Sequence, residues 1–180
     1  MRRLKSRARR GVAAVELAFV FLFFFIPVLF GVWEAGRLIE VQQIVSNSAR
    51  EGARLAAQGY TINSSGAPTQ IMASSGTPNV QSVVYSYLIA AGLTNLQPSD
   101  VTVTFAFTAP RTTAPNIGTY PTDPYLGEKN EPFTVTVTIP WSKVQWINVG
   151  LIQPATITFT ATWQMLIDDA FTVNQTMPTM

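Results

Sequence analysis

The spacing of hydrophobic positions changes along the first third of the chain, and each spacing predicts a helix. From Val12 to Trp33 nearly every residue is apolar, which is long enough to cross a bilayer as a helix of about 20 residues. Beyond Trp33 the apolar residues recur every three or four positions, the pattern of an amphipathic helix; they are Leu38, Val41, Val45, Ala49, Ala53 and Ala56. One helix is therefore expected from Val12 to about Gly59, about 70 Å long at 1.5 Å per residue.

The other face of the amphipathic half carries polar and charged residues. Glu34 with Arg37, and Glu51 with Arg54, are three residues apart, so each pair is expected to support the helix by a few tenths of a kcal/mol. Gly59 is the expected stop. Residues 60–79 are predicted to be a linker because Gly, Pro and Ser interrupt any period.

A second, shorter helix is expected from Val80 to Ala91, ended by Gly92. After it the period becomes two, which predicts β-strands. Apolar residues alternate with threonine over 101–107, 133–139 and 156–163, so each strand has one apolar and one threonine-rich face. Residues 109–132 are expected to form a long loop, and 141–151 a helical turn or capping loop. Phe171 and Val173 in the polar tail could add a fourth strand.

These elements predict an α+β fold. A long amino-terminal helix, transmembrane and then amphipathic, and a short second helix pack on a small antiparallel sheet of three to four strands. The expected organisation is a basic leader (1–11), a transmembrane helix (12–33), its extracytoplasmic extension (34–59), the linker (60–79) and an α+β domain (80–180).

Charge is distributed very unevenly. Six of the 12 basic residues precede Gly11, whereas residues 60–180 contain three basic and six acidic residues, a net charge of −3. The basic leader predicts a cytoplasmic amino terminus and an extracytoplasmic domain under the positive-inside rule. No small-residue cleavage site follows the apolar run, so a retained anchor is expected. The acidic balance of the domain gives nucleic-acid binding no support.

The chain contains no His and no Cys, which removes the commonest general base and all thiol chemistry. No catalytic constellation is evident, and neither an enzymatic activity, a metal site nor a cofactor is predicted.

The sharpest local signal is Gly11 followed by Val12, with Glu16 inside the apolar segment. Small residues at this junction would let an intramembrane protease reach the Gly11–Val12 bond. A carboxylate at membrane depth costs several kcal/mol and is a functional hypothesis by default; after cleavage, Glu16 could pair with the new Val12 amine of a neighbouring subunit. The residues alone leave open a plain signal anchor whose Glu16 sits near the headgroups.

Three weaker signals each have a structural explanation. Residues 50–54 could be a partner surface or a solvated helical face. The loop residues Asp123, Glu128 and Glu131 could bind Ca²⁺, but their spacing matches no EF-hand and a solvated loop is favoured. Trp141 and Trp146 are expected in packing more than in a sugar-binding platform.

Three stretches resemble the TadE-like family, pseudopilins (minor pilins) of the bacterial Tad, or type IVc, pilus system. They are Gly11-Val12-Ala13-Ala14-Val15-Glu16-Leu17-Ala18, Phe30-Gly31-Val32-Trp33-Glu34-Ala35-Gly36-Arg37 and Asn47-Ser48-Ala49-Arg50-Glu51-Gly52-Ala53-Arg54-Leu55-Ala56. The resemblance implies processing by a prepilin peptidase after Gly11, insertion in the inner membrane, and assembly of Tad/Flp-type adhesive pili with a partner pseudopilin and other pilus components. It also implies that Glu16 is the assembly carboxylate. The large domain argues against a shaft subunit.

Two other classes remain as alternatives. A membrane-anchored extracytoplasmic binding module would share the same anchor and domain without any pilus role. An anchored hydrolase is disfavoured by the lack of His and Cys.

Overall fold

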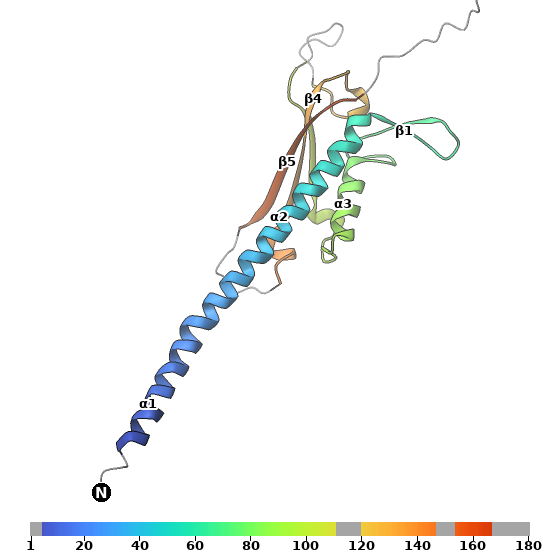
Figure 1. Cartoon of the computed structure of the whole chain (residues 1–180). Helices are drawn as coiled ribbons and strands as arrows, with labels where there is room; N and C mark the ends of the chain where they lie inside the picture. Colours follow the sequence, from blue (N-terminus) through green and yellow to red (C-terminus); the bar gives the residue numbers. More distant parts are fainter. Residues whose placement is uncertain (1–4, 111–119, 147–153, 167–180) are drawn as a thin grey trace, which may run out of the picture.

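The computed structural model describes residues 5–110, 120–146 and 154–166 of the chain. A long helix runs from the amino-terminal end, and its far half lies against a sheet and a shorter helix (Figure 1). This is the α+β arrangement that the sequence predicts, with the first half of the long helix standing clear of the domain.

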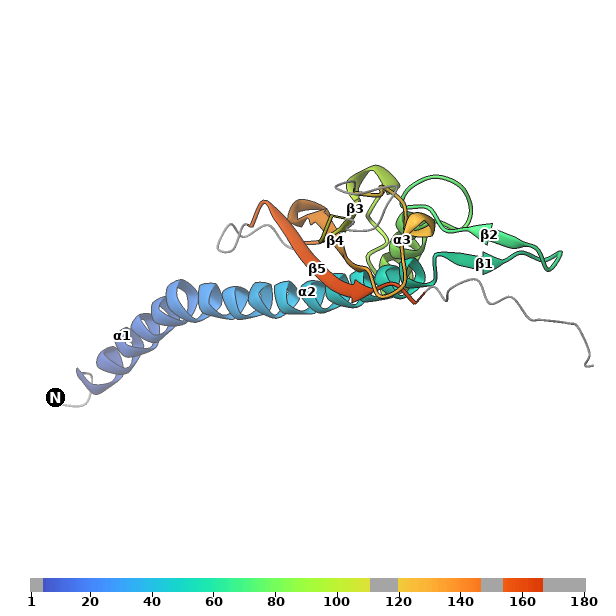
Figure 2. The same cartoon turned by 90° about the horizontal axis from the view of Figure 1, so that it is seen from above.

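The long helix has three parts: α1 (Lys5–Val20), a π-helical turn η1 (Phe21–Phe25) and α2 (Ile26–Gln58). It begins inside the predicted leader rather than at Val12. The π turn follows from Pro27, which has no N–H for the carbonyl of Phe23 and whose ring crowds that carbonyl. The turn widens, and the N–H of Ile26 bonds to the carbonyl of Phe21, five residues back. The helix axis bends between α1 and α2 (Figure 2).

The apolar stripe of α2 is the centre of the core, as predicted. Val41, Val45, Ala49, Ala53 and Ala56 are all fully buried, and each buried valine contributes about 1.5–3 kcal/mol. The helix ends at Gln58 because Gly59 adopts φ 64°, a conformation that favours glycine.

Helix α3 (Val80–Ala90) packs on α2, and the prediction of a short second helix is confirmed. Its first turn is capped by Asn79, whose side-chain oxygen accepts a hydrogen bond from the N–H of Ser82 at 2.7 Å. Gly92 follows with φ 98°. Val80, Val84 and Leu88 form the buried face of α3.

The predicted linker contains a small hairpin. Strands β1 (Tyr60–Ile62) and β2 (Pro68–Gln70) pair antiparallel, and the hairpin extends away from the domain (Figure 2). The side chain of Asn63 closes its turn by accepting hydrogen bonds from the N–H groups of Ser65 and Ala67 at 3.0 and 2.9 Å. Three-residue strands are too short to show a period, so the sequence gives no strand signal here.

The main sheet consists of β3 (Thr102–Phe107), β4 (Pro132–Pro140) and β5 (Thr156–Gln164), antiparallel in the order β3-β4-β5. In the central strand β4 the apolar residues are buried while the threonines face outward. Across that outer face, Thr136 bonds to Thr160 at 2.9 Å and Thr138 to Thr158 at 3.0 Å. The three predicted strands are confirmed.

Short 3-10 turns connect these elements: η2 (Pro98–Asp100), η3 (Pro124–Leu126) and η4 (Trp141–Lys143). The last confirms a helical turn at the start of 141–151, whose end lies outside the described residues. Part of the 109–132 loop and the fourth strand suggested at 171–173 also lie outside them.

Candidate functional site

The sequence-predicted site residues all lie on the free half of the long helix. Gly11, Val12 and Glu16 are exposed positions of α1. A methyl group added at Gly11 would meet nothing within 4 Å. The fold therefore holds these three residues away from the domain, on a surface that is available to a membrane or another protein.

Helix geometry fixes their relation to one another. Val12 and Glu16 are four residues apart and so share one face of α1, one turn from each other. Side chains on a helix lean toward its amino end, which directs the Glu16 carboxylate toward Val12. The Gly11–Val12 bond lies inside α1, and glycine weakens a helix more than any other residue apart from proline.

An apolar surface surrounds this part of the helix. Within the described residues, one helix, Gly11–Gln58, is long and apolar enough to cross a membrane, and its most apolar window is not buried by the domain. Exposed side chains include Leu17, Phe19, Phe21, Leu22, Phe23, Phe24, Phe25 and Leu29. Such a belt is costly in water and suited to hydrocarbon, which indicates a single membrane anchor.

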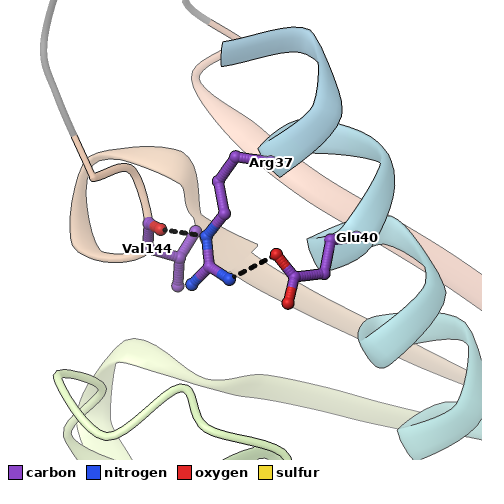
Figure 3. Close-up of polar contacts among 3 residues, drawn as sticks. All are labelled: Arg37, Glu40 and Val144. Carbon is purple, nitrogen blue, oxygen red and sulfur yellow. Dashed lines mark hydrogen bonds and ion pairs between the residues drawn. The ribbon is translucent and has the colours of Figure 1, made fainter. Parts of the chain in front are cut away.

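Arg37 connects α2 to the segment that follows η4, close to the point where the helix leaves the apolar belt. Its Nε donates a hydrogen bond to the carbonyl of Val144 at 3.1 Å, and Nη1 pairs with Glu40 at 2.9 Å (Figure 3). The guanidinium also lies 4.9 Å from the centre of the Trp146 ring. The Arg37 side chain is only 10% exposed, although it belongs to the polar face of the amphipathic stretch.

Glu34 does not form the predicted pair with Arg37. It is buried, with 6% of its surface exposed, and neither carboxylate oxygen has a hydrogen-bond partner. Glu34 precedes Leu38, Val41 and Val45 by four, seven and eleven residues, so its position continues the apolar stripe of α2. That spacing was visible in the sequence and could have indicated burial. A buried carboxylate without donors costs stability.

Trp141, in η4, and Trp146, three residues after η4 ends, have different surroundings. Trp141 is 2% exposed and belongs to the core, as expected. Trp146 is 64% exposed and meets Trp33 edge-on, with ring centres 6.2 Å apart. Together with Arg37 these two rings mark the junction between the free helix and the domain.

The side chains of residues 50–54 lie in three different environments. Glu51 and Arg54 form the predicted pair at 2.6 Å, and the hydrogen bond from Arg54 lowers the pKa of the Glu51 carboxyl. Gly52 and Ala53 face the core: a methyl group at Gly52 would stand 2.6 Å from Cγ2 of Val84. Arg50 remains exposed.

The acidic loop residues serve as local hydrogen-bond acceptors. Asp123 accepts from the N–H of Ala73 at 2.9 Å, and Glu131 accepts from the N–H of Glu128 at 2.8 Å. Among the described residues, no group of three or more acidic side chains is placed to hold a metal ion. The Ca²⁺ hypothesis therefore gains no geometric support from this loop.

The comparison with protein families concerns the helix just described. Residues 11–54 match the family model described as TadE-like protein. This segment, 44 of the 180 residues, is similar to TadE-like proteins. Searches of the curated proteins and of the solved structures found no match.

The matched segment begins at Gly11 and ends at Arg54, so it contains most of the long helix and stops before the hairpin. It includes the exposed apolar belt, the Arg37 junction and the buried stripe except for Ala56. The strands and α3 lie outside the match. The similarity of this segment to TadE-like proteins is consistent with a protein associated with the Tad pilus.

Proposed function

We propose that this protein is a minor pilin of the Tad system, held in the bacterial inner membrane by its single helix and acting in assembly of Tad/Flp-type adhesive pili. The observation that carries the proposal is that the TadE-like match begins at Gly11, the residue at the junction between basic leader and apolar helix. The leader stays in the cytoplasm by its six positive charges, and the α+β domain lies on the other side of the membrane.

In this proposal a prepilin peptidase hydrolyses the Gly11–Val12 bond. The oxygen of water adds to the Gly11 carbonyl carbon and the bond to the Val12 nitrogen breaks. The leader departs with a carboxylate, and Val12 keeps its nitrogen as an ammonium group. The loss of six basic residues changes the formal net charge from +2 to −4.

Glu16 then acts as the assembly carboxylate. A lone carboxylate at membrane depth costs several kcal/mol, and a cation beside it offsets that cost. The Val12 ammonium group of a neighbouring subunit supplies this cation when helices pack side by side. The energy of the pair therefore favours association of processed subunits and gives unprocessed ones no equivalent contact.

Processing is tested by expressing the full chain with and without its prepilin peptidase and measuring intact mass and the amino-terminal residue. We expect Val12 as the first residue only when the peptidase is present. Gly11→Val, which stabilises the helix and enlarges the junction, should block the change. Gly36→Ala is the matched control, because it also replaces an unhindered helix glycine and should be processed normally. A chain that keeps Met1 with active peptidase would refute processing.

The role of Glu16 is tested separately. Glu16→Ala should be processed at Gly11 but should abolish piliation, and Glu16→Asp should restore part of it. If Glu16→Ala cells carry normal pili, the assembly role is wrong and the anchored binding module becomes the better explanation.

A further inference from the structure

A groove runs between α2 and strand β5, on the side of the molecule away from α3. Its volume is about 720 Å³, and its α2 wall consists of one helical stripe. The stripe residues are Leu38, Ile39, Gln42, Gln43, Ser46, Asn47 and Arg50. Arg50 follows Leu38 by twelve positions, which makes the groove about 18 Å long at 1.5 Å per residue.

The other wall of the groove is the edge of a sheet. Four consecutive residues of β5 line it, Thr156 to Phe159. Because alternate residues of a strand face opposite sides, a consecutive run means that the groove follows the strand's edge rather than one face. Among the described strands β5 pairs only with β4, so its other edge presents unpaired N–H and C=O groups.

The groove has a charge and a direction. None of its described lining residues is acidic, and its single cation is Arg50, at the end farther from the membrane helix. The Arg50 guanidinium lies 5.9 Å from the centre of the Phe159 ring, and Arg50 forms no ion pair with any described carboxylate. Leu38 and Ile157 make the opposite end apolar.

We propose that this groove binds the tail segment of a second copy of the chain, residues 168–173. The segment reads Asp-Asp-Ala-Phe-Thr-Val, two carboxylates followed by alternating apolar residues. Six extended residues span about 20 Å at 3.3 Å each, which matches the groove. Laid antiparallel to β5, the segment places its carboxylates at Arg50 and directs Phe171 and Val173 toward the apolar end, while its backbone bonds to the free edge.

The occupant is a second copy rather than the same chain because of register. Leu166 is tied to α2 by its N–H, which bonds to the carbonyl of Ala57 at 2.7 Å. Phe159 lies seven residues before Leu166, so a strand returning along its own β5 brings about the seventh residue after Leu166, Val173, opposite Phe159. Its carboxylates then miss Arg50. A neighbouring copy has no such constraint.

The chain has no cysteine, so introduced thiols report on one contact at a time. Two differently tagged full-length variants, Gln42→Cys and Thr172→Cys, are mixed in detergent micelles and oxidised; both positions lie about 12 Å from Arg50 along the groove in the proposed register. We expect a disulfide-linked heterodimer. The control pair, Thr104→Cys on the opposite edge strand with Thr172→Cys, should form none above background. Failure of the first pair to exceed the control would overturn the proposal.

Charge reversal tests the recognition. Arg50→Glu in the Gln42→Cys chain should lower heterodimer formation about tenfold, since like charges then meet at the groove end. Asp168→Lys with Asp169→Lys in the other chain should restore it. The matched control is Arg54→Glu, one turn away and outside the groove, which should change nothing. Equal losses for Arg50→Glu and Arg54→Glu would refute recognition by Arg50.

The double variant Gln42→Cys, Thr172→Cys in one chain separates the two occupants. A crosslink found only within monomers at low protein concentration would show that the chain's own tail fills the groove, and the second-copy proposal would be wrong. The contact does not require cleavage at Gly11, so this result is independent of whether the processing proposal holds.

Discussion

The close packing at Gly52 gives the most quantitative prediction. Replacing Gly52 with Ala places a Cβ atom 2.6 Å from Cγ2 of Val84 and 3.2 Å from Cγ1 of Val80, where carbon atoms prefer 3.5–4.0 Å. Val84 is fully buried and, being β-branched on a helix, has one strongly preferred rotamer, so it cannot turn away. Overpacking of this kind costs about 1–3 kcal/mol.

The same substitution also stabilises the helix through its intrinsic propensity, since alanine is favoured over glycine in a helix interior by about 1 kcal/mol. The net expectation for Gly52→Ala is a loss of about 1 kcal/mol. Gly36→Ala is the matched control on the same helix: nothing lies within 4 Å of its added methyl group, so it should gain about 1 kcal/mol. The two glycines should therefore differ by about 2 kcal/mol.

The assay is thermal unfolding of the full chain in detergent micelles, followed by far-ultraviolet circular dichroism and tryptophan fluorescence. For a chain of this size 1 kcal/mol shifts Tm by about 2–4 °C. Adding Val84→Ala should relieve the clash, so the double variant with Gly52→Ala should be more stable than the sum of its parts by about 1 kcal/mol. If Gly52→Ala melts at or above Gly36→Ala, contact with α3 does not limit this position.

Three further predictions concern charged groups of the domain. Arg37→Ala should lower stability by about 1–2 kcal/mol, because it leaves the carbonyl of Val144 without its charged donor, and hydrogen exchange near Val144 should quicken; unchanged exchange would contradict the role of this bond. Glu34→Met should raise stability by about 1–3 kcal/mol, since an apolar side chain of similar shape replaces a buried, undonated carboxylate; a lower Tm would mean that the carboxylate has a partner. The third is a pH dependence: the N–H of Gln97, and then Lys143, lower the pKa of Asp100 below its ordinary value of 3.8. Its folded pKa is thus below its unfolded pKa, so its contribution to stability is present above pH of about 4 and is lost as pH falls through the folded value. Asp100→Asn should flatten part of the acid limb in a pH series of Tm values, and an identical limb would refute this assignment.

Periodicity predicted those helices and strands in which the buried positions recur with the period of the backbone. The stripe of Val41 and Val45 reads as a helix, and the alternation of Phe133 with Thr134 reads as a strand, because in both cases burial follows the backbone period. Asn79 and Gly92 then mark the ends of α3 through local hydrogen bonds and backbone conformation. These features are local, so the sequence contains the information directly.

Other features depend on contacts between distant residues. Arg37 looks like a solvated cation until the η4 segment, 107 residues away, brings the carbonyl of Val144 to it. The groove beside Arg50 exists only because β5 lies next to α2. Gly11 and Glu16 are a different case. The sequence located them, but both are exposed on the free half of the long helix. Their predicted roles therefore depend on contacts with other molecules.

The continuity of α2 has a mechanical consequence. Its residues from Val41 to Ala57 are a wall of the domain core, and the same helix continues without a break down to Ile26, at the level of the exposed apolar belt. A pull on the anchor is therefore transmitted as shear along the whole contact between α2, the sheet and α3, where many contacts resist together. A flexible tether would instead place the same force on one end of a strand. A protein built in this way can be drawn out of a bilayer by its domain, or held in it by its helix, without the two parts separating.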